Sequence, residues 1–355
     1  MAVAEDIHRE IADLRGQLDA LELARHEIAK KLETLEFDLA NQESPATHAA
    51  TGKVTGSSGS SDKIRLMRSL FRGRVDVFPR RWQSAKSGKS GYSPVCRNEW
   101  KPGICAKPQI KCAQCTNQAL LPIDDDIIRS HLSGRTSGGS VETTIGVYAM
   151  LPDDTCWFLA IDFDKHSWME ELSAFRQSAR SNGVPVAIER SRSGNGAHAW
   201  IFFAEPVPAS QARRLGTILI SETLERYPDL GFDSYDRMFP SQDTMPIGGF
   251  GNLIALPLQH SARQDGNSVF VDDNFHPYQD QWAYLSSIER VSRDQLDTLV
   301  REAGSRGKII RIPLPSANEE AEEPWTALPS HRNNEAAITE TLPKTVSVVL
   351  ANLFG

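Results

Sequence analysis

The stretch at residues 156–164, Cys-Trp-Phe-Leu-Ala-Ile-Asp-Phe-Asp, constrains the fold of this chain more than any other. Its apolar run fits a buried strand, in which residues two apart share a face, so Asp162 and Asp164 are expected to point the same way. Two carboxylates at the edge of a core repel each other and lose hydration, and a cation between them relieves both effects. Such oxygens suit Mg²⁺ or Mn²⁺, although two solvated acids at a strand end are an equally simple interpretation of this pair alone.

The length of 355 residues exceeds that of a usual single domain, and changes in composition divide the chain. We expect a coiled coil at 1–42, a flexible linker at 43–61, a basic zinc-binding segment at 62–122, a catalytic domain at 123–312 and an acidic, Pro-rich tail at 313–355. No apolar run approaches the length of a membrane span and no signal-peptide core is present, so we expect a cytoplasmic location without a membrane partner.

The N-terminal segment has a heptad pattern. Apolar residues recur over residues 3–41 in alternating steps of three and four, interrupted only by Arg25, which predicts a coiled coil of roughly five heptads. A single helix of this kind leaves its apolar stripe exposed. We therefore expect a homo-oligomer formed through residues 3–41, with docking onto the body of the same chain as the alternative.

Residues 62–111 form a basic segment in a chain whose net charge is −7. They contain thirteen Lys and Arg but only three Asp and Glu, with aromatic residues between them. This mixture suits phosphate backbones and stacked bases, so nucleic acid is the expected partner. A solvated basic face with a few packed aromatic residues is the alternative.

Four of the five cysteines lie close together in this region, at Cys96, Cys105, Cys112 and Cys115. A reducing cytosol disfavours disulfides, and four thiolates that end in a Cys-x-x-Cys can complete a tetrahedral zinc site. The sequence therefore predicts structural zinc, although the first two spacings are looser than in common zinc motifs.

The order of strands and helices indicates the fold class. Strand patterns occupy residues 145–150, 156–164, 184–190, 197–203 and 268–271, and helical patterns occupy residues 63–71, 123–132, 167–181, 208–227 and 292–303. We expect residues 145–150 and 156–164 to form a hairpin. The alternation predicts an α+β fold, in which helices cover one face of an antiparallel or mixed sheet.

A second chemical feature is the loop between two of these strands. Gly194 and Gly196 allow backbone N–H groups to approach an anion, Ser193 adds a hydroxyl and Arg190 adds positive charge. His198 begins the next strand and can donate to a phosphate oxygen, although a lone histidine is more often a core residue.

A third feature is the segment 232–240, which offers a further carboxylate at Asp233 or Asp236. On a strand these two acids would face opposite sides, and the pattern alone does not choose between them. Three acids, an anion-binding loop and a basic segment together indicate metal-assisted phosphoryl or nucleotidyl transfer on nucleic acid.

These motifs resemble a known family. Asp162-x-Asp164, Ser193-Gly-x-Gly-x-His198 and a later aspartate resemble the three motifs of archaeo-eukaryotic primases and primase-polymerases. Residues 235–243 and 248–258, with the upstream cysteines, are similar to the primase domain of TOTE conflict systems, although the Ser-Gly-x-Gly-x-His loop is one residue shorter than is usual in replicative primases. The resemblance covers residues 62–345 and implies an RRM-like palm joined to a smaller αβ unit.

The resemblance also implies residue roles. Asp162, Asp164 and Asp236 would hold two Mg²⁺ or Mn²⁺ ions, with Tyr-Asp-Arg at 235–237 favouring Asp236 over Asp233, while His198 and Ser193 would bind the triphosphate.

Arg190, Gly194 and Gly196 would complete the nucleotide-binding loop, and Asn252 and Arg263 are further candidates for nucleotide or template contacts. The implied function is a template-dependent DNA primase or polymerase that acts on DNA with NTP or dNTP, with helicase and nuclease partners. A metal-dependent nuclease and a non-catalytic DNA-binding adaptor are the alternatives.

Overall fold

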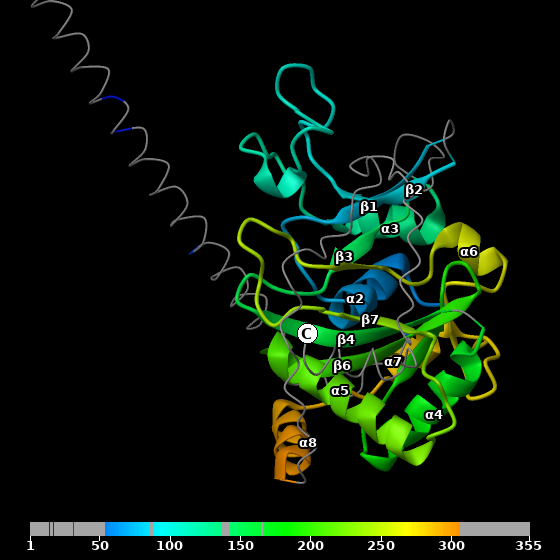
Figure 1. The fold of residues 1–355 in the computed structure, drawn as a ribbon. Helices are drawn as coiled ribbons and strands as arrows, with labels where there is room; N and C mark the ends of the chain where they lie inside the picture. The colour runs from blue at the N-terminus through cyan, green and yellow to red at the C-terminus, as the bar shows by residue number, and fades with distance from the viewer. Residues whose placement is uncertain are drawn as a thin grey trace, which may run out of the picture. The chain divides into compact units, whose positions relative to one another are not determined.

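The computed structural model describes residues 54–84, 88–135, 143–164 and 166–305, and only Leu14, Gln17 and Lys31 of the N-terminal segment. Its strands are β1 (Pro79–Gln83), β2 (Ser90–Pro94), β3 (Gly146–Tyr148), β4 (Thr155–Asp164), β5 (Ala187–Arg190), β6 (Gly196–Pro208), β7 (Tyr235–Phe239), β8 (Leu253–Ala255) and β9 (Val269–Val271). Its helices are α2 (Ser60–Leu70), α3 (Asp125–Ser133), α4 (Trp168–Ser181), α5 (Ala209–Arg226), α6 (His260–Gln264), α7 (Gln281–Ser286) and α8 (Arg293–Ser305), with a 3-10 turn at Cys112–Gln114 (Figure 1). The predicted mixture of helices and strands is confirmed.

The largest sheet has five strands in the order β7-β4-β6-β5-β9, and every neighbouring pair in it is antiparallel. β4 and β6 lie at its centre and are its longest strands. The apolar run of β4 is buried because the strand has a neighbour on each edge and packed side chains on both faces.

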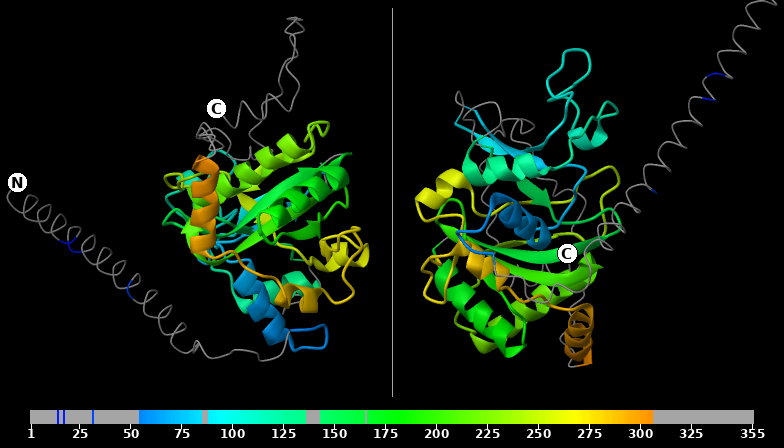
Figure 2. Two further views of the ribbon diagram at one scale, coloured as in Figure 1. Left: turned by 90° about the horizontal axis from the view of Figure 1, so that it is seen from below. Right: turned by 180° about the vertical axis from the view of Figure 1, so that it is seen from behind.

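Different elements cover the two faces of this sheet. α4 and α5 pack on one face, where Phe163 of β4 lies 5.6 Å from Phe175 of α4 between ring centroids. α2 lies on the opposite side, where Phe71 at its C-terminal end contacts Trp200 of β6 at 4.9 Å (Figures 1 and 2). Because side chains alternate along a strand, β4 directs its even-numbered positions to the α2 side.

Two smaller sheets lie apart from the five strands. β1 and β2 form a hairpin, β3 pairs with β8, and an isolated bridge between Arg80 and Ile145 links the two pairs. The predicted hairpin between residues 145–150 and 156–164 is therefore wrong. The chain does turn at the expected place, where the N–H of Leu151 donates to the carbonyl of Thr155 at 2.8 Å. However, β6 and β7 occupy both edges of β4, so β3 has to find another partner.

The longer predicted helices are confirmed with shifts of a few residues, and local chemistry explains one of their ends. Asp124 caps α3, because its carboxylate accepts the N–H of Ile127 at 2.8 Å. α3 ends at Gly134, whose φ of +67° suits a residue without a β-carbon. No helix among the described residues is both long and apolar enough to cross a membrane.

The start of the described body differs from the predicted linker at 43–61. The N–H of Gly56 donates to Asp280 at 2.8 Å, Ser286 donates to the carbonyl of Val54 at 3.2 Å, and α2 already begins at Ser60. Residues 54–61 therefore belong to the body. The predicted coiled coil lies outside the described residues, apart from Leu14, Gln17 and Lys31, which are helical. The predicted tail at 313–355 lies wholly outside them.

Candidate active site

The two acids of β4 share one face of the sheet, as the sequence predicted. Asp162 is paired in register with His198 of β6, and Asp164 with Gly196. Burial raises the pKa of Asp162 above its ordinary value; the negative charges of Asp236 and Asp164 raise it further, while His198 acts in the opposite direction. The carboxylates are therefore close enough to act on one another, which is the electrostatic condition for a cation site.

A bulge in β7 brings the third acid to this place. Ile161 pairs with Met238 and Phe163 pairs with Tyr235, so Asp162 alone faces both Asp236 and Arg237. The Nε of Arg237 donates to the carboxylate of Asp236 at 2.7 Å. The charges of both residues act on Asp162, which a regular strand would not allow for two consecutive side chains.

Asp233, the other candidate for the third acid, lies before β7. Its backbone N–H donates to Glu171 at 3.1 Å, and its charge is not among those that shift the pKa of Asp162. The geometry thus favours Asp236 as the acid that joins Asp162 and Asp164.

His198 is held between two carboxylates. Its Nδ1 lies 2.6 Å from Oε2 of Glu189, and its Nε2 lies 3.6 Å from Oδ1 of Asp162. Burial by itself would lower the pKa of His198, but the charge of Glu189, the hydrogen bond to it and the charge of Asp162 raise the pKa to about 9. With Nδ1–H on Glu189, Nε2 is turned toward the acids and carries a proton in the cationic form.

Glu189 is a functional candidate that the sequence analysis missed. It is 2% exposed on β5, and it also accepts from Nε1 of Trp200 at 3.4 Å and from Oγ of Ser268 at 3.3 Å. An acidic residue directly after the buried apolar pair Ala187 and Ile188 was the available signal. Its partner could not be identified, because β5, β6 and β9 meet only in the folded sheet.

The loop at 190–196 is a tight turn that depends on its glycines. The N–H of Ser191 donates to the carbonyl of Gly196 at 2.8 Å, and Gly194 has a φ of +78°. A β-carbon at Gly196 would lie 2.4 Å from the carbonyl oxygen of Phe163, so β6 can approach β4 here only through glycine. The side chains of Ser193 and its neighbour Arg192 are exposed, and the hydroxyl of Ser193 accepts the N–H of Asn195 within the turn at 3.3 Å.

Three of the predicted nucleotide contacts make hydrogen bonds within the fold. Arg190 donates to the carbonyls of Gly266 at 3.1 Å and Phe275 at 2.6 Å. Asn252 donates to the carbonyl of Met238 at 2.9 Å and accepts from the N–H of Ser241 at 3.1 Å. Arg263 donates to the carbonyl of Leu132 at 2.5 Å. These side chains stabilise the loops around the site, and no hydrogen bond joins them to the acids within the described part of the chain.

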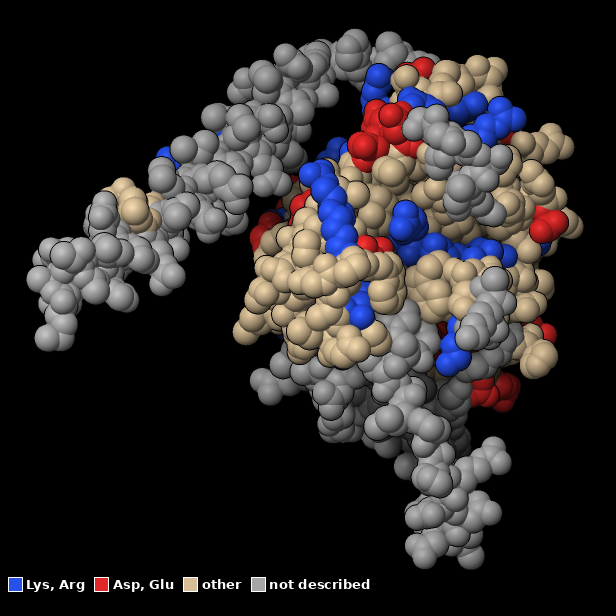
Figure 3. Space-filling model, turned by 90° about the horizontal axis from the view of Figure 1, so that it is seen from above, with Lys and Arg blue, Asp and Glu red and all other residues tan. Residues whose placement is uncertain are grey.

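The β1–β2 hairpin brings basic residues near the same region. Burial raises the pKa of Tyr92 on β2 to about 12, while the positive charges of Arg192 and Arg81 oppose the rise and Glu189 adds to it. Tyr92 is therefore within electrostatic reach of both the loop and Glu189. Figure 3 shows Lys and Arg side chains, with some Asp and Glu among them, on the face of the molecule that it draws.

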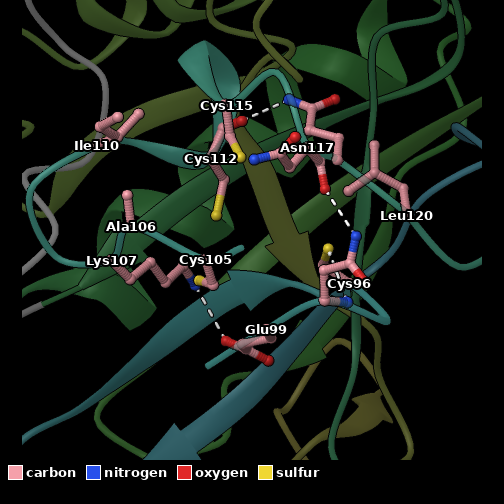
Figure 4. Close-up of a pocket in the computed structure, with 12 residues that line it drawn as sticks. Cys96, Glu99, Cys105, Ala106, Lys107, Ile110, Cys112, Cys115, Asn117 and Leu120 are labelled. Carbon is pink, nitrogen blue, oxygen red and sulfur yellow. Dashed lines mark hydrogen bonds and ion pairs between the residues drawn. The ribbon is translucent and has the colours of Figure 1, made fainter. Parts of the chain in front are cut away.

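The four clustered cysteines, Cys96, Cys105, Cys112 and Cys115, line one pocket and form no disulfide (Figure 4). The backbone N–H groups of Asn98 and Ala119 both donate to Sγ of Cys96 at 3.4 Å. In the stretches that the structure describes, however, no three His, Cys, Asp or Glu side chains are arranged to hold a metal ion. The four cysteines therefore line one pocket without forming a metal-holding cluster. Asp162, Asp164 and Asp236 do not form such a cluster in the described residues either.

The fold and the site define a mixed α/β protein whose antiparallel sheet presents three carboxylates and a partly buried histidine on one face. Residues 62–299 match the family described as TOTE conflict system, Archaeo-Eukaryotic Primase domain. The chain belongs to this family, and the resemblance noted in the sequence is confirmed. Membership supports a nucleotidyltransferase function of the primase type.

Among solved structures, a polymerase domain is remotely similar to this chain. The polymerase domain from Mycobacterium tuberculosis ligase D in complex with DNA is similar over 71% of this chain and 91% of that chain, with 14% sequence identity and a TM-score of 0.32. No curated protein matches this chain.

Proposed function

We propose that this chain is a template-dependent DNA primase or polymerase in which Asp162, Asp164 and Asp236 hold two divalent metal ions. The observation that carries the proposal is the gathering of these acids and His198 on one face of the sheet, in a member of this primase family. Solvated acids at a strand end would not need a bulge in the neighbouring strand to bring a third acid to them.

The donor set fits Mg²⁺ or Mn²⁺ by its chemistry. Three carboxylates offer hard oxygen ligands, and the mutual repulsion that raises the pKa of Asp162 would be relieved by bound cations. Because the carboxylate of Asp236 accepts a hydrogen bond from Arg237, the side chain of Asp236 has to turn toward the other two acids to act as a metal ligand. When bound, the ions would neutralise phosphate charge and lower the pKa of the attacking hydroxyl.

The residues around the acids would bind the triphosphate of the incoming nucleotide. Nε2 of His198 is turned toward the acids and would donate to a phosphate oxygen, while Glu189 holds the other ring nitrogen. Ser193 and Arg192 would add a hydroxyl and a guanidinium from the exposed loop. Arg190 would act indirectly by holding the neighbouring loops through its two carbonyl contacts.

The basic segment would bind the template. Tyr92, which pairs with Arg81 in the β1–β2 hairpin, lies within electrostatic reach of Arg192 in the nucleotide loop, so a nucleic acid strand on the hairpin would pass close to the acids. Zinc bound by Cys96, Cys105, Cys112 and Cys115 would fix the chain between β2 and α3.

A primer-extension assay tests the proposal. The full chain is incubated with a labelled primer on a template, NTP or dNTP, and Mg²⁺ or Mn²⁺, alongside Asp162→Asn, Asp164→Asn and the exposed control Asp297→Asn on α8. The loss of a metal ligand removes several kcal/mol of transition-state stabilisation, so extension by the first two variants should fall at least about a hundredfold. The control should extend primers at the wild-type rate.

Two outcomes contradict the proposal. Shortening of the primer that requires Asp162 would indicate the metal-dependent nuclease, and retention of DNA without any change in its length would indicate the non-catalytic adaptor. Parallel reactions without a primer distinguish a primase from a polymerase that only extends.

A further inference from the structure

Glu171 is a buried carboxylate on α4, the helix that follows β4, and it is not one of the three candidate metal ligands. It belongs to the first turn of α4 and is only 1% exposed, although a glutamate at a helix start is normally solvated. A buried carboxylate is costly unless hydrogen bonds satisfy it, so its partners indicate its function.

The partners of Glu171 come from the segment that follows β4 and from the segment that precedes β7. On the β4 side, Oγ of Ser167, three residues beyond Asp164, donates to Oε1 at 2.6 Å. On the β7 side, the N–H groups of Asp233 and Ser234 donate at 3.1 and 3.0 Å, and the hydroxyl of Ser234 donates to Oε2.

The two strand ends are also joined directly. The backbone N–H of Asp164 donates to the carbonyl of Ser234 at 2.7 Å, and Ser234 is fully buried. Asp236 follows Ser234 by two residues. One carboxylate thus holds the segment that follows Asp164 and the segment that precedes Asp236 in a fixed relation.

A negative charge in the first turn also stabilises a helix, which is the simplest role for Glu171. That role would be fulfilled by a solvated side chain and would not require three donors from the segment before β7. The contacts of Glu171 are those expected of a residue that orients ligands from behind.

We propose that Glu171 is a positioning residue that sets the separation of Asp164 and Asp236, and thereby the affinity of the site for divalent ions. The inference rests on the proposed function, because it takes these acids as metal ligands. Glu171→Gln keeps the size of the side chain but replaces one acceptor oxygen with an NH₂ group, so it cannot accept all the bonds that the carboxylate accepts.

Mn²⁺ binding to the full chain tests the proposal without relying on activity. Titration followed by electron paramagnetic resonance should give a dissociation constant about tenfold higher for Glu171→Gln, as expected for a residue behind metal ligands. In extension assays the half-saturating Mn²⁺ concentration should rise with it, while the KM for primer and template stays unchanged. A general loss of stability would not raise the half-saturating Mn²⁺ concentration while leaving the KM for primer and template unchanged.

Controls keep the outcomes distinct. Glu222→Gln on α5 removes a partly buried carboxylate that accepts from Asn182 at 2.6 Å away from the acids, and it should bind Mn²⁺ as the wild type does. If Glu171→Gln does not fold, Ser167→Ala removes a single donor and should give a smaller rise in the dissociation constant. If Glu171→Gln folds and binds Mn²⁺ with wild-type affinity, the inference is overturned. If Glu171→Gln does not fold, wild-type Mn²⁺ affinity in Ser167→Ala overturns it. If Asp162→Asn leaves Mn²⁺ binding unchanged, the proposed metal site itself is wrong and the inference is overturned with it.

Discussion

His198 should make the stability of the folded chain depend on pH. Its pKa is about 9 in the folded chain, against an ordinary value of 6.5. Because the folded chain binds this proton more tightly than the unfolded chain does, protonation of His198 stabilises the fold. This contribution is present in full below about pH 6.5 and is lost as the pH rises through about 9.

The measurement is urea unfolding of chelator-treated protein at pH 6 and pH 10, compared with His198→Gln and Glu189→Gln. The free energy of unfolding of the wild type should fall by on the order of 2–3 kcal/mol more than that of either variant. An equal fall in all three proteins would show that the bond between His198 and Glu189 does not stabilise the cationic ring.

The choice between the two candidate third acids gives another prediction for single residues. Asp236→Asn should reduce primer extension at least about a hundredfold, because a ligand carboxylate is lost. Asp233→Asn should extend primers at close to the wild-type rate, because the contact of Asp233 with Glu171 is made by its backbone N–H. Extension rates measured at saturating Mn²⁺ compare the two, and the reverse order would reassign the third ligand.

The cysteine segment gives a prediction for one element. We expect about one zinc per chain by elemental analysis, because four cysteines, Cys96, Cys105, Cys112 and Cys115, line one pocket and structural zinc sites usually have four ligands. Cys112→Ser combined with Cys115→Ser should lose the metal and melt at a lower temperature, since structural zinc contributes folding free energy. Cys156→Ala, a change in the core of β4, should keep its zinc. Zinc-free protein from a purification without chelators would contradict the assignment.

At the scale of elements, the sequence was informative where periodicity and local chemistry act alone. Helices α4 and α5 and the central strand β4 follow from runs of apolar residues at the spacing of a helix or a strand. The pairing of β3 with β8 was missed, because an apolar strand indicates that it needs a partner without indicating which one. The bulge at Asp236 and Arg237 was also missed, since it depends on the register between β7 and β4.

The whole molecule is predicted to self-associate through residues 3–41. A single helix with the predicted apolar seam would leave its stripe exposed to water, so it needs a partner. The full chain should be a dimer or a higher oligomer by light scattering at micromolar concentration. Removal of residues 1–53, which ends before the contacts of Val54 and Gly56 with the body, should give a monomer.

That truncated protein should still extend primers, because none of the proposed metal or triphosphate ligands lies in the deleted segment. A monomeric mass for the full chain would contradict self-association and leave a helix of another protein as the partner. A truncated protein that is monomeric but inactive would instead show that the assembly is required for synthesis.

The sequence by itself determined the family, the mixed fold and the face shared by Asp162 and Asp164, because these depend on motifs and on the two-residue repeat of a strand. Only the tertiary structure placed Asp236 opposite Asp162, revealed Glu189 behind His198 and placed Glu171 between two strand ends. Those relations join residues far apart in the chain, and they arise from strand register and from the need of buried charges for hydrogen-bond partners. Neither factor leaves a periodic signal in the sequence.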